Sequence, residues 1–222
     1  MRRDSLTRIR SALRERSSKA MTTGEYKATG PTGARFIFLI IGANSSGKST
    51  CANYLAVALN GVVLEFGDTV REHIKNDPTL ARDPSIAYEM LLFRHGSSLL
   101  VQWARNSLVL STDTQALIMV GVRDESAYRQ LISEFPSAIR IAVIADQELR
   151  RERDVFRSPH YGVEFPLNTV AFINRDELHQ KWGLGIILCE AHFTIQNSGS
   201  ITELHQQLDI IIARIIEEST NA

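Results

Sequence analysis

The stretch Phe36-Ile-Phe-Leu-Ile-Ile-Gly42-Ala-Asn-Ser-Ser-Gly47-Lys48-Ser49 decides the fold of this chain. Its first six residues are all apolar, as in a strand that is buried on both faces of a sheet. The next eight fit the pattern G-x-x-x-x-G-K-[ST], and a helix is expected to follow through about residue 60. A strand, a glycine-rich loop and a helix in this order are typical of a loop that binds phosphate groups.

The residue types in this loop suit that chemistry. Glycines let the backbone curl, so that consecutive N–H groups point inward at phosphate oxygens, and the helix N-terminus adds its positive end. Lys48 can reach the β- and γ-phosphates of a nucleotide, and the Ser49 hydroxyl can ligate Mg²⁺. The loop alone leaves a GTPase, a motor, a transporter ATPase and a small-molecule kinase open.

Downstream of the loop, segments with strand and helix patterns alternate. Strands are expected at 62–66, 116–120, 139–145 and 192–196, and helices at about 85–94, 97–110, 124–133, 149–157, 169–190 and 201–217. Asp68 is the expected N-cap of a further helix after the second strand. Five strands that alternate with helices predict an α/β fold, in which a parallel sheet is covered on both faces.

Charge is unevenly spread along the 222 residues, although 25 basic side chains balance 25 acidic ones. Residues 1–35 hold nine basic and three acidic side chains, so the remaining body is acidic, which argues against a broad nucleic-acid surface. We expect residues 1–34 to be a basic, flexible extension, with an organellar transit peptide as the less favoured alternative. Residues 35–222 are expected to form one domain.

Cysteine content and hydropathy limit the location. Cys51 and Cys189 are the only cysteines, which suggests a reducing compartment. No apolar run approaches the roughly 20 residues that a membrane helix needs. We expect a cytoplasmic protein that has no membrane partner and whose body binds no nucleic acid; the oligomeric state is open.

Charged residues follow the expected strands at the carboxyl edge of the sheet, where ligands bind in open α/β folds. Asp68 and Arg71 share one helix face after the second strand, Arg94 ends a later helix, and Arg123 follows the third strand. We expect these four side chains to face the acceptor of a phosphoryl group, with Asp68 able to take a proton from a hydroxyl acceptor. The alternatives are that Asp68 is only an N-cap, that Arg71 is only solvated, and that Arg94 is an ordinary cation of a last helical turn.

Two further arginines lie on one face of the helix after the fourth strand. Arg150 and Arg153 can neutralise charge on a phosphoryl group during its transfer. The alternative is a solvent-facing row that pairs with Glu152 and Asp154. We expect the catalytic residues of phosphoryl transfer to be Lys48, Asp68, Arg150 and Arg153.

The order of these features resembles the nucleoside monophosphate kinase-like group of P-loop proteins. The resemblance rests on motifs that follow one another along the chain. They are the phosphate loop, the Asp68/Arg71 element, Arg94-His95-Gly96, Gly121-Val-Arg123, the arginine-rich helix and Asn197-Ser-Gly199. Over residues 35–217 the chain looks most similar to the dephospho-CoA-kinase-like and the archaeal or phage deoxynucleotide-kinase-like branches.

The resemblance implies a five-stranded sheet of order 2-3-1-4-5, an acceptor-binding insertion at about 68–110 and a lid at about 147–168. It also implies ATP and Mg²⁺ as cofactors, with Ser49 as the metal ligand. In such proteins the turn after the last strand lies near the adenine. The expected ATP-binding residues are therefore Gly42, Ala43, Asn44, Ser45, Ser46, Gly47, Lys48, Ser49, Thr50, Asn197, Ser198 and Gly199.

One departure from the pattern concerns the third strand. Relatives often carry Asp-Gly-x-Arg there, whereas this chain has Val120-Gly121-Val122-Arg123, so an acid is missing.

The expected function is ATP-dependent phosphoryl transfer to a nucleoside or deoxynucleoside monophosphate. Transfer to a hydroxyl of a metabolite, as in dephospho-CoA kinases, is one alternative, and an ATP-binding regulatory module with weak or lost kinase activity is another.

Overall fold

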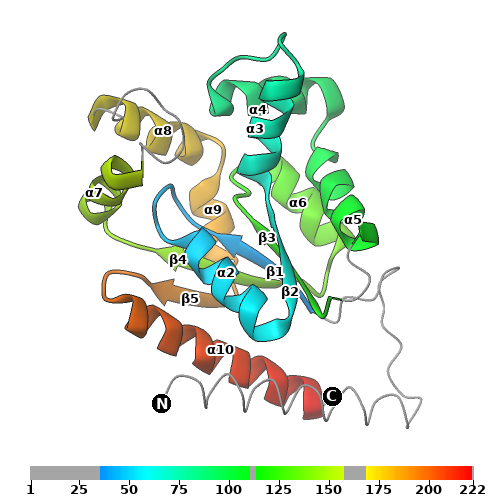
Figure 1. The fold of residues 1–222 in the computed structure, drawn as a ribbon, viewed down its shortest axis with the longest axis vertical. Coiled ribbons are helices and arrows are strands. Elements are labelled where there is room, and N and C mark those ends of the chain that lie inside the picture. Colours follow the sequence, from blue (N-terminus) through cyan, green and yellow to red (C-terminus); the bar gives the residue numbers. More distant parts are fainter. Residues whose placement is uncertain (1–35, 111–113, 158–168, 222) are drawn as a thin grey trace.

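The structure is a computed structural model that describes residues 36–110, 114–157 and 169–221. Its centre is a parallel sheet of order β2-β3-β1-β4-β5 (Figure 1), which confirms the predicted strand order. The strands are β1 (Phe36–Ile41), β2 (Gly61–Glu65), β3 (Ala116–Val120), β4 (Ile139–Ile144) and β5 (Phe193–Gln196). Because all are parallel, their carboxyl ends meet at one edge, where the loop after β1 lies.

Helices cover both faces of the sheet (Figure 1). They are α2 (Lys48–Leu59), α3 (Phe66–Asn76), α4 (Pro84–His95), α5 (Leu99–Leu110), α6 (Glu125–Glu134), α7 (Gln147–Arg157), α8 (Thr169–Lys181), α9 (Leu184–Cys189) and α10 (Ile201–Asn221). Alternate residues of β1 face opposite sides. Phe38 and Ile40 pack with α2 and α10, whereas Leu39 and Ile41 pack with α3, α4, α5, α6 and α9. This two-sided burial explains why the strand reads as a continuous apolar run.

Two expected helix boundaries are wrong. β2 runs directly into α3, whose N-cap is Glu65, so Asp68 lies in the first helical turn rather than at the cap. The helix expected at 169–190 is two helices, because the backbone at Gly183 takes a left-handed conformation with φ 93° between α8 and α9.

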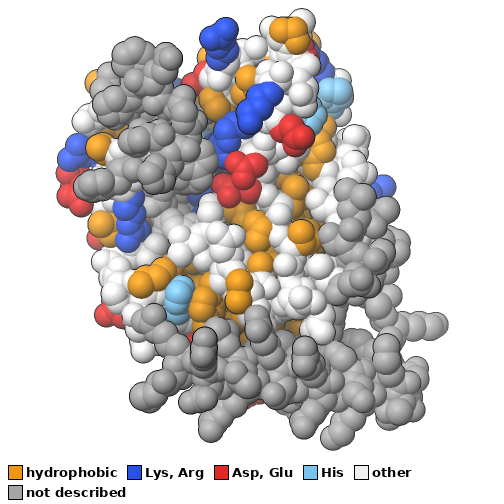
Figure 2. Space-filling view, in the orientation of Figure 1, with side chains coloured by type: hydrophobic (Ala, Val, Ile, Leu, Met, Phe, Trp, Pro, Cys, Tyr) orange, Lys and Arg blue, Asp and Glu red, His pale blue; other side chains and the backbone are white. Residues whose placement is uncertain are grey.

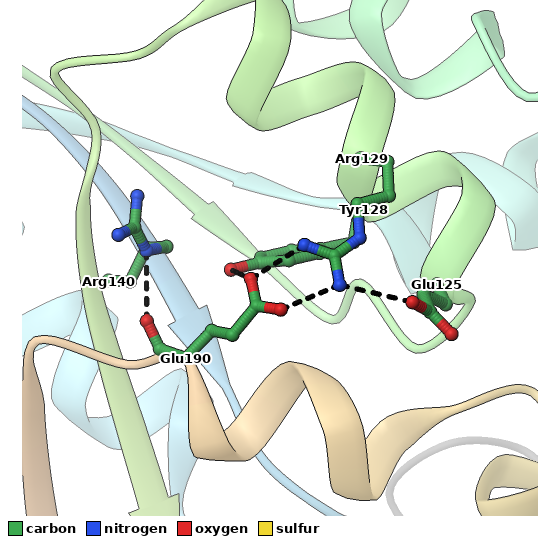
Figure 3. A network of polar contacts seen from close by, with 5 residues as sticks. All are labelled: Glu125, Tyr128, Arg129, Arg140 and Glu190. Carbon is green, nitrogen blue, oxygen red and sulfur yellow. Dashed lines mark hydrogen bonds and ion pairs between the residues drawn. The ribbon is translucent and has the colours of Figure 1, made fainter.

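A polar network ties the chain after α9 to α6 and β4 (Figure 3). The Glu190 carboxylate accepts hydrogen bonds from Arg129, at 2.6 and 2.8 Å, and from the Tyr128 hydroxyl at 3.1 Å. Arg129 also pairs with Glu125, and Arg140 Nε donates to the Glu190 carbonyl. Arg140 lies in the amino-terminal half of β4, so these contacts brace the sheet away from the phosphate loop.

Two predicted segments fall wholly or partly beyond the described residues. The basic extension at 1–34 lies outside them, as does the 158–168 part of the expected lid, whose first part is α7. The expected insertion at 68–110 corresponds to most of α3 and all of α4 and α5. Within the described part of the chain, no helix combines the length and hydrophobicity needed to cross a bilayer.

Candidate functional site

The loop between β1 and α2 has the curled backbone that its glycines permit. Gly47 has φ 101°, and Ser45 takes the left-handed region with φ 58°. A Cβ built on Gly42 would lie 2.4 Å from the Val143 carbonyl oxygen of β4, so only glycine lets these backbones come so close. The loop ends at Lys48, where α2 begins and its first N–H groups become available to a ligand.

Buried polar contacts hold this loop in shape. Lys48 is 8% exposed, and its Nζ donates to the Ala43 carbonyl oxygen at 2.6 Å. From the turn after β5, Asn197 Nδ2 donates to the Ser46 carbonyl oxygen at 2.7 Å. A Cβ on Gly47 would lie only 2.1 Å from that same Nδ2. Asn197 therefore stabilises the loop from the turn after β5, through a contact that the sequence did not reveal.

The structure brings a carboxylate to the loop from an unexpected strand. Ser49 Oγ donates to Glu65 Oε2 at 3.0 Å. Glu65 ends β2 and pairs in register with Val120 of β3. Its carboxylate therefore lies one strand away from Val120, the position at which relatives often carry an acid. The sequence signal was an acid at the carboxyl end of a strand, but only the strand order shows that this strand lies beside β3.

Ser49 and Glu65 fit a magnesium site. Hard oxygen ligands suit Mg²⁺, which is commonly held by one or two protein groups together with substrate phosphates and water. No cluster of three or more His, Cys, Asp or Glu side chains with metal-binding geometry occurs among the described residues. The pair at the start of α2 is consistent with a metal that needs phosphate oxygens to complete its coordination.

Arg150 lies at the junction of α7, α8 and the loop. Its guanidinium pairs with Asp176 through two hydrogen bonds of 2.9 and 2.5 Å, and it donates to the Asn44 carbonyl oxygen at 3.2 Å. The side chain is 9% exposed. The structure thus places Arg150 against the phosphate loop, while a carboxylate partner already occupies two of its donors.

A second ion pair joins the same elements. Asp154 of α7 accepts from Ser45 Oγ at 2.9 Å and from Arg175 Nη2 of α8 at 2.6 Å. Arg175 was not predicted as a site residue, because it follows the lid by sequence and only the fold returns it to the loop.

Several buried N–H groups around this junction have no hydrogen-bond partner among the described residues. They are Arg123 Nε, Arg153 Nη1, Arg175 Nε and His179 Nδ1. An unpaired buried donor is costly, so such a group usually marks a place where a ligand or an ordered water supplies an acceptor. Four nitrogen donors that belong to arginines and a histidine suit an anion.

The pKa of His179 reflects the positive electrostatic potential in this region. Burial lowers its pKa to about 2, and the positive charges of Arg123, Lys48, Arg175 and Arg150 act in the same direction. Burial also lowers the pKa of Arg123 to about 10, so its guanidinium remains protonated at neutral pH. The region is therefore cationic while His179 itself is neutral.

Asp68 and Arg71 of α3 pair with each other and lie near the surface. In Figure 2, acidic and basic side chains gather over the part of this face where α3 lies. The positive charge of Arg71 helps to lower the pKa of Arg123, which places the two arginines near each other.

Arg94 belongs to a different neighbourhood. It pairs with Asp77 at 2.8 Å and donates to Thr79 Oγ1 at 3.1 Å, both in the connection between α3 and α4. The 11 residues of α3 extend about 16 Å from the end of β2 to this connection. Neither of these two contacts joins Arg94 to the phosphate loop.

The turn at 197–199 borders a pocket of about 420 Å³. Ser198 and Gly199 line it together with Gln196, Gln206 and Ile210. The pocket lies beside the first turns of α10 and includes the turn that the family resemblance assigns to the base of the nucleotide. Burial raises the pKa of Cys51 to about 12, so this thiol of α2 stays protonated and packs in the core.

Comparisons with known proteins support the fold. No protein-family model and no curated protein matches the chain. Among solved structures, a shikimate kinase from Aquifex aeolicus vf5 is similar with a TM-score of 0.52 and 15% identity, over 84% of this chain and 100% of that one.

Two further structures show comparable similarity. A shikimate kinase from Bacteroides thetaiotaomicron has a TM-score of 0.50 and 11% identity, over 81% of this chain and 98% of that one. A gluconokinase from Sinorhizobium meliloti 1021 has a TM-score of 0.49 and 13% identity, over 85% and 97%. At such low identity the shikimate kinase similarities establish the P-loop kinase fold and do not single out the dephospho-CoA or deoxynucleotide kinase branch.

Proposed function

We propose that this protein is a kinase that transfers the γ-phosphoryl group of Mg·ATP to a small acceptor. The observation that carries the proposal is the set of buried N–H donors without described acceptors beside a curled phosphate loop. Phosphoryl transfer depends mainly on positioning and on stabilising charge that spreads over phosphate oxygens. A cluster of fixed cations next to a phosphate loop is suited to that task.

Each residue has a defined part in this proposal. The amides of residues 42–49 and Lys48 hold the phosphates, while Arg150, Arg153 and Arg175 surround the group in transfer. Ser49 and Glu65 would hold Mg²⁺, which neutralises charge on the phosphates when it is bound. The pocket beside Asn197, Ser198 and Gly199 would receive the base.

The contact between Ser49 and Glu65 favours catalysis over a purely regulatory ATP-binding role. The missing acid at Val120 was the reason to consider lost activity. Glu65 supplies a carboxylate to the Ser49 hydroxyl from the neighbouring strand, so the chain retains an acid near the expected metal.

We propose a nucleoside or deoxynucleoside monophosphate as the acceptor, because an acceptor phosphate is already an anion and needs charge neutralisation more than a base. Arg123 and Arg71 would supply that charge. A hydroxyl acceptor is the second candidate, since Asp68 lies at the same edge of the sheet and could take its proton. The shikimate kinase fold similarity makes hydroxy acids worth including in a screen.

An acceptor screen tests this function directly. The full chain is incubated with Mg·ATP and one of a panel of nucleoside monophosphates, deoxynucleoside monophosphates, dephospho-CoA or shikimate, and ADP is followed in a coupled assay. We expect ADP to form only when a suitable acceptor is present. Acceptor-independent hydrolysis, or no turnover together with tight ATP binding, would support the regulatory alternative instead.

A further inference from the structure

Most arginines of the site are held by carboxylates, and Arg123 is held differently. Arg150 pairs with Asp176, and Arg175 pairs with Asp154. Arg71 and Arg94 likewise have acidic partners. Arg123 instead has Nη1 3.2 Å from Nε2 of His179, and none of the salt bridges among the described residues includes it.

The chemistry of this contact fixes the state of His179. A guanidinium has only donors, so Nε2 of His179 must accept and the ring proton must lie on Nδ1. His179 is 0% exposed, and burial together with the surrounding cations opposes its protonation, as its low pKa records. The imidazole is therefore a neutral hydrogen-bond acceptor for Arg123.

A neutral partner has a different effect from a carboxylate. Asp176 and Asp154 each fix an arginine and also cancel its charge. His179 fixes the Arg123 guanidinium and adds no opposing charge of its own. Glu65 acts on Arg123 through its charge alone and accepts its hydrogen bond from Ser49, and the adjacent Asp124 caps α6 through the Ala127 N–H.

The position of Arg123 suits a ligand. It follows Gly121 at the carboxyl end of β3, where ligands bind in open α/β folds, and the residue is half-buried. Its Nε is buried and has no acceptor among the described residues. A half-buried guanidinium with an unused donor is a strong site for an oxyanion.

We propose that His179 is a positioning residue that orients Arg123 without neutralising it, so that Arg123 binds an anionic group of the acceptor. This inference rests on the proposed kinase function and names its acceptor class as a small phosphate monoester or carboxylate. His179 does not touch the phosphoryl group itself. Its effect on the acceptor passes through Arg123.

Two variants of equal size separate this role from a packing role. His179→Gln keeps a neutral oxygen acceptor for Arg123, whereas His179→Glu places a carboxylate there and cancels its charge. Calorimetry on protein saturated with Mg·ADP measures the binding of AMP, CMP, GMP, UMP and shikimate. The nucleotide and hydroxy-acid arms distinguish a phosphate from a carboxylate as the recognised group.

We expect at least one of these anions to bind the wild-type protein. Its affinity should stay within about threefold in His179→Gln and fall about 10- to 100-fold in His179→Glu, as for loss of a hydrogen bond to a charged group. The far-UV circular dichroism spectra of all three proteins should coincide, which shows that the variants are folded. Arg123→Gln should reduce anion affinity as much as His179→Glu does, and it provides the test if His179→Glu does not fold.

Two results would overturn the inference while leaving the kinase proposal intact. One is a set of variants without the expected loss, in which anion affinity is equal in His179→Gln and His179→Glu or is unchanged in Arg123→Gln. The other is a wild-type protein that binds Mg·ADP but none of the five anions. Failure of the wild-type protein to bind Mg·ADP would instead refute the kinase function on which the inference rests.

Discussion

Glu65 illustrates how a neighbouring strand can bring a carboxylate to the phosphate loop. Its carboxylate reaches the Ser49 hydroxyl although β3 ends in Val120. If the pair holds Mg²⁺, Glu65→Gln should raise the half-saturating magnesium concentration for ADP formation by about 10- to 100-fold, because a neutral amide is a poorer partner for the cation. Glu72→Gln, at an exposed position of α3, is the matched control and should leave the magnesium requirement unchanged. An unaltered requirement in Glu65→Gln would exclude this role.

Lys48 gives the second prediction at the scale of single residues. Its buried ammonium group now donates to the Ala43 carbonyl oxygen and lies where nucleotide phosphates are expected. Lys48→Ala should reduce acceptor-dependent turnover by about 100- to 1000-fold, which is the usual cost of removing one preorganised charge-stabilising donor. Lys75→Ala, on the exposed end of α3, serves as control. Near-normal turnover of Lys48→Ala, with an unchanged circular dichroism spectrum, would contradict the proposed site.

At the scale of elements, the phosphate loop depends on the turn between β5 and α10. Asn197 donates to the buried Ser46 carbonyl oxygen, and the close fit at Gly47 leaves no room for a larger side chain. Asn197→Ala should lower the free energy of unfolding by about 1–3 kcal/mol, since the carbonyl loses its partner, and should also weaken ADP binding. Urea unfolding and calorimetry measure the two effects. Asn76→Ala, at the exposed end of α3, should change neither, and a stable Asn197→Ala protein with wild-type ADP affinity would show that the brace is unnecessary.

The elements of the fold could be predicted from local patterns. The apolar run of β1 and the spacing of Gly42, Gly47 and Lys48 already indicate a strand, a loop and a helix, because those signals depend only on nearby residues. Alternation of strands and helices predicted the parallel sheet, while the strand order came from the family resemblance. The break at Gly183 was missed, because a glycine inside a helical pattern does not by itself reveal a left-handed backbone.

The candidate site was harder to predict for a physical reason. Glu65 meets Ser49 across 16 positions, and His179 meets Arg123 across 56, so neither contact has a local sequence signal. Arg94 illustrates the opposite case. Its position at the end of a helix suggested the cleft, but its contacts with Asp77 and Thr79 depend on how α3 and α4 pack.

On the scale of the whole molecule, α7 contacts the phosphate loop and is joined to α8 by two ion pairs. Arg150 and Asp154 contact the loop from α7, and their partners Asp176 and Arg175 lie in α8. Two of the cations beside the loop, Arg150 and Arg175, are thus each paired with an acid from another element. The contact between Arg123 and His179 includes no acid. The free-energy cost of burying these two groups therefore lowers the stability of the entire domain.

That cost gives a prediction about global stability and pH. The folded protein holds His179 neutral with a pKa of about 2, whereas an unfolded histidine titrates near 6.5. Between these values only the unfolded state takes up the proton, so stability that is present above about pH 6.5 is lost as the pH falls. For one such histidine, lowering the pH from 7 to 5 should reduce the free energy of unfolding by about 2 kcal/mol. Urea unfolding of wild-type protein and His179→Gln at both pH values isolates this contribution, because the other five histidines are common to both proteins. The decrease should be about 2 kcal/mol smaller in His179→Gln, and His95→Gln, at an exposed position, should behave like the wild type. Equal decreases in wild-type protein and His179→Gln would show that His179 accepts a proton in the folded state, which its burial among four cations opposes.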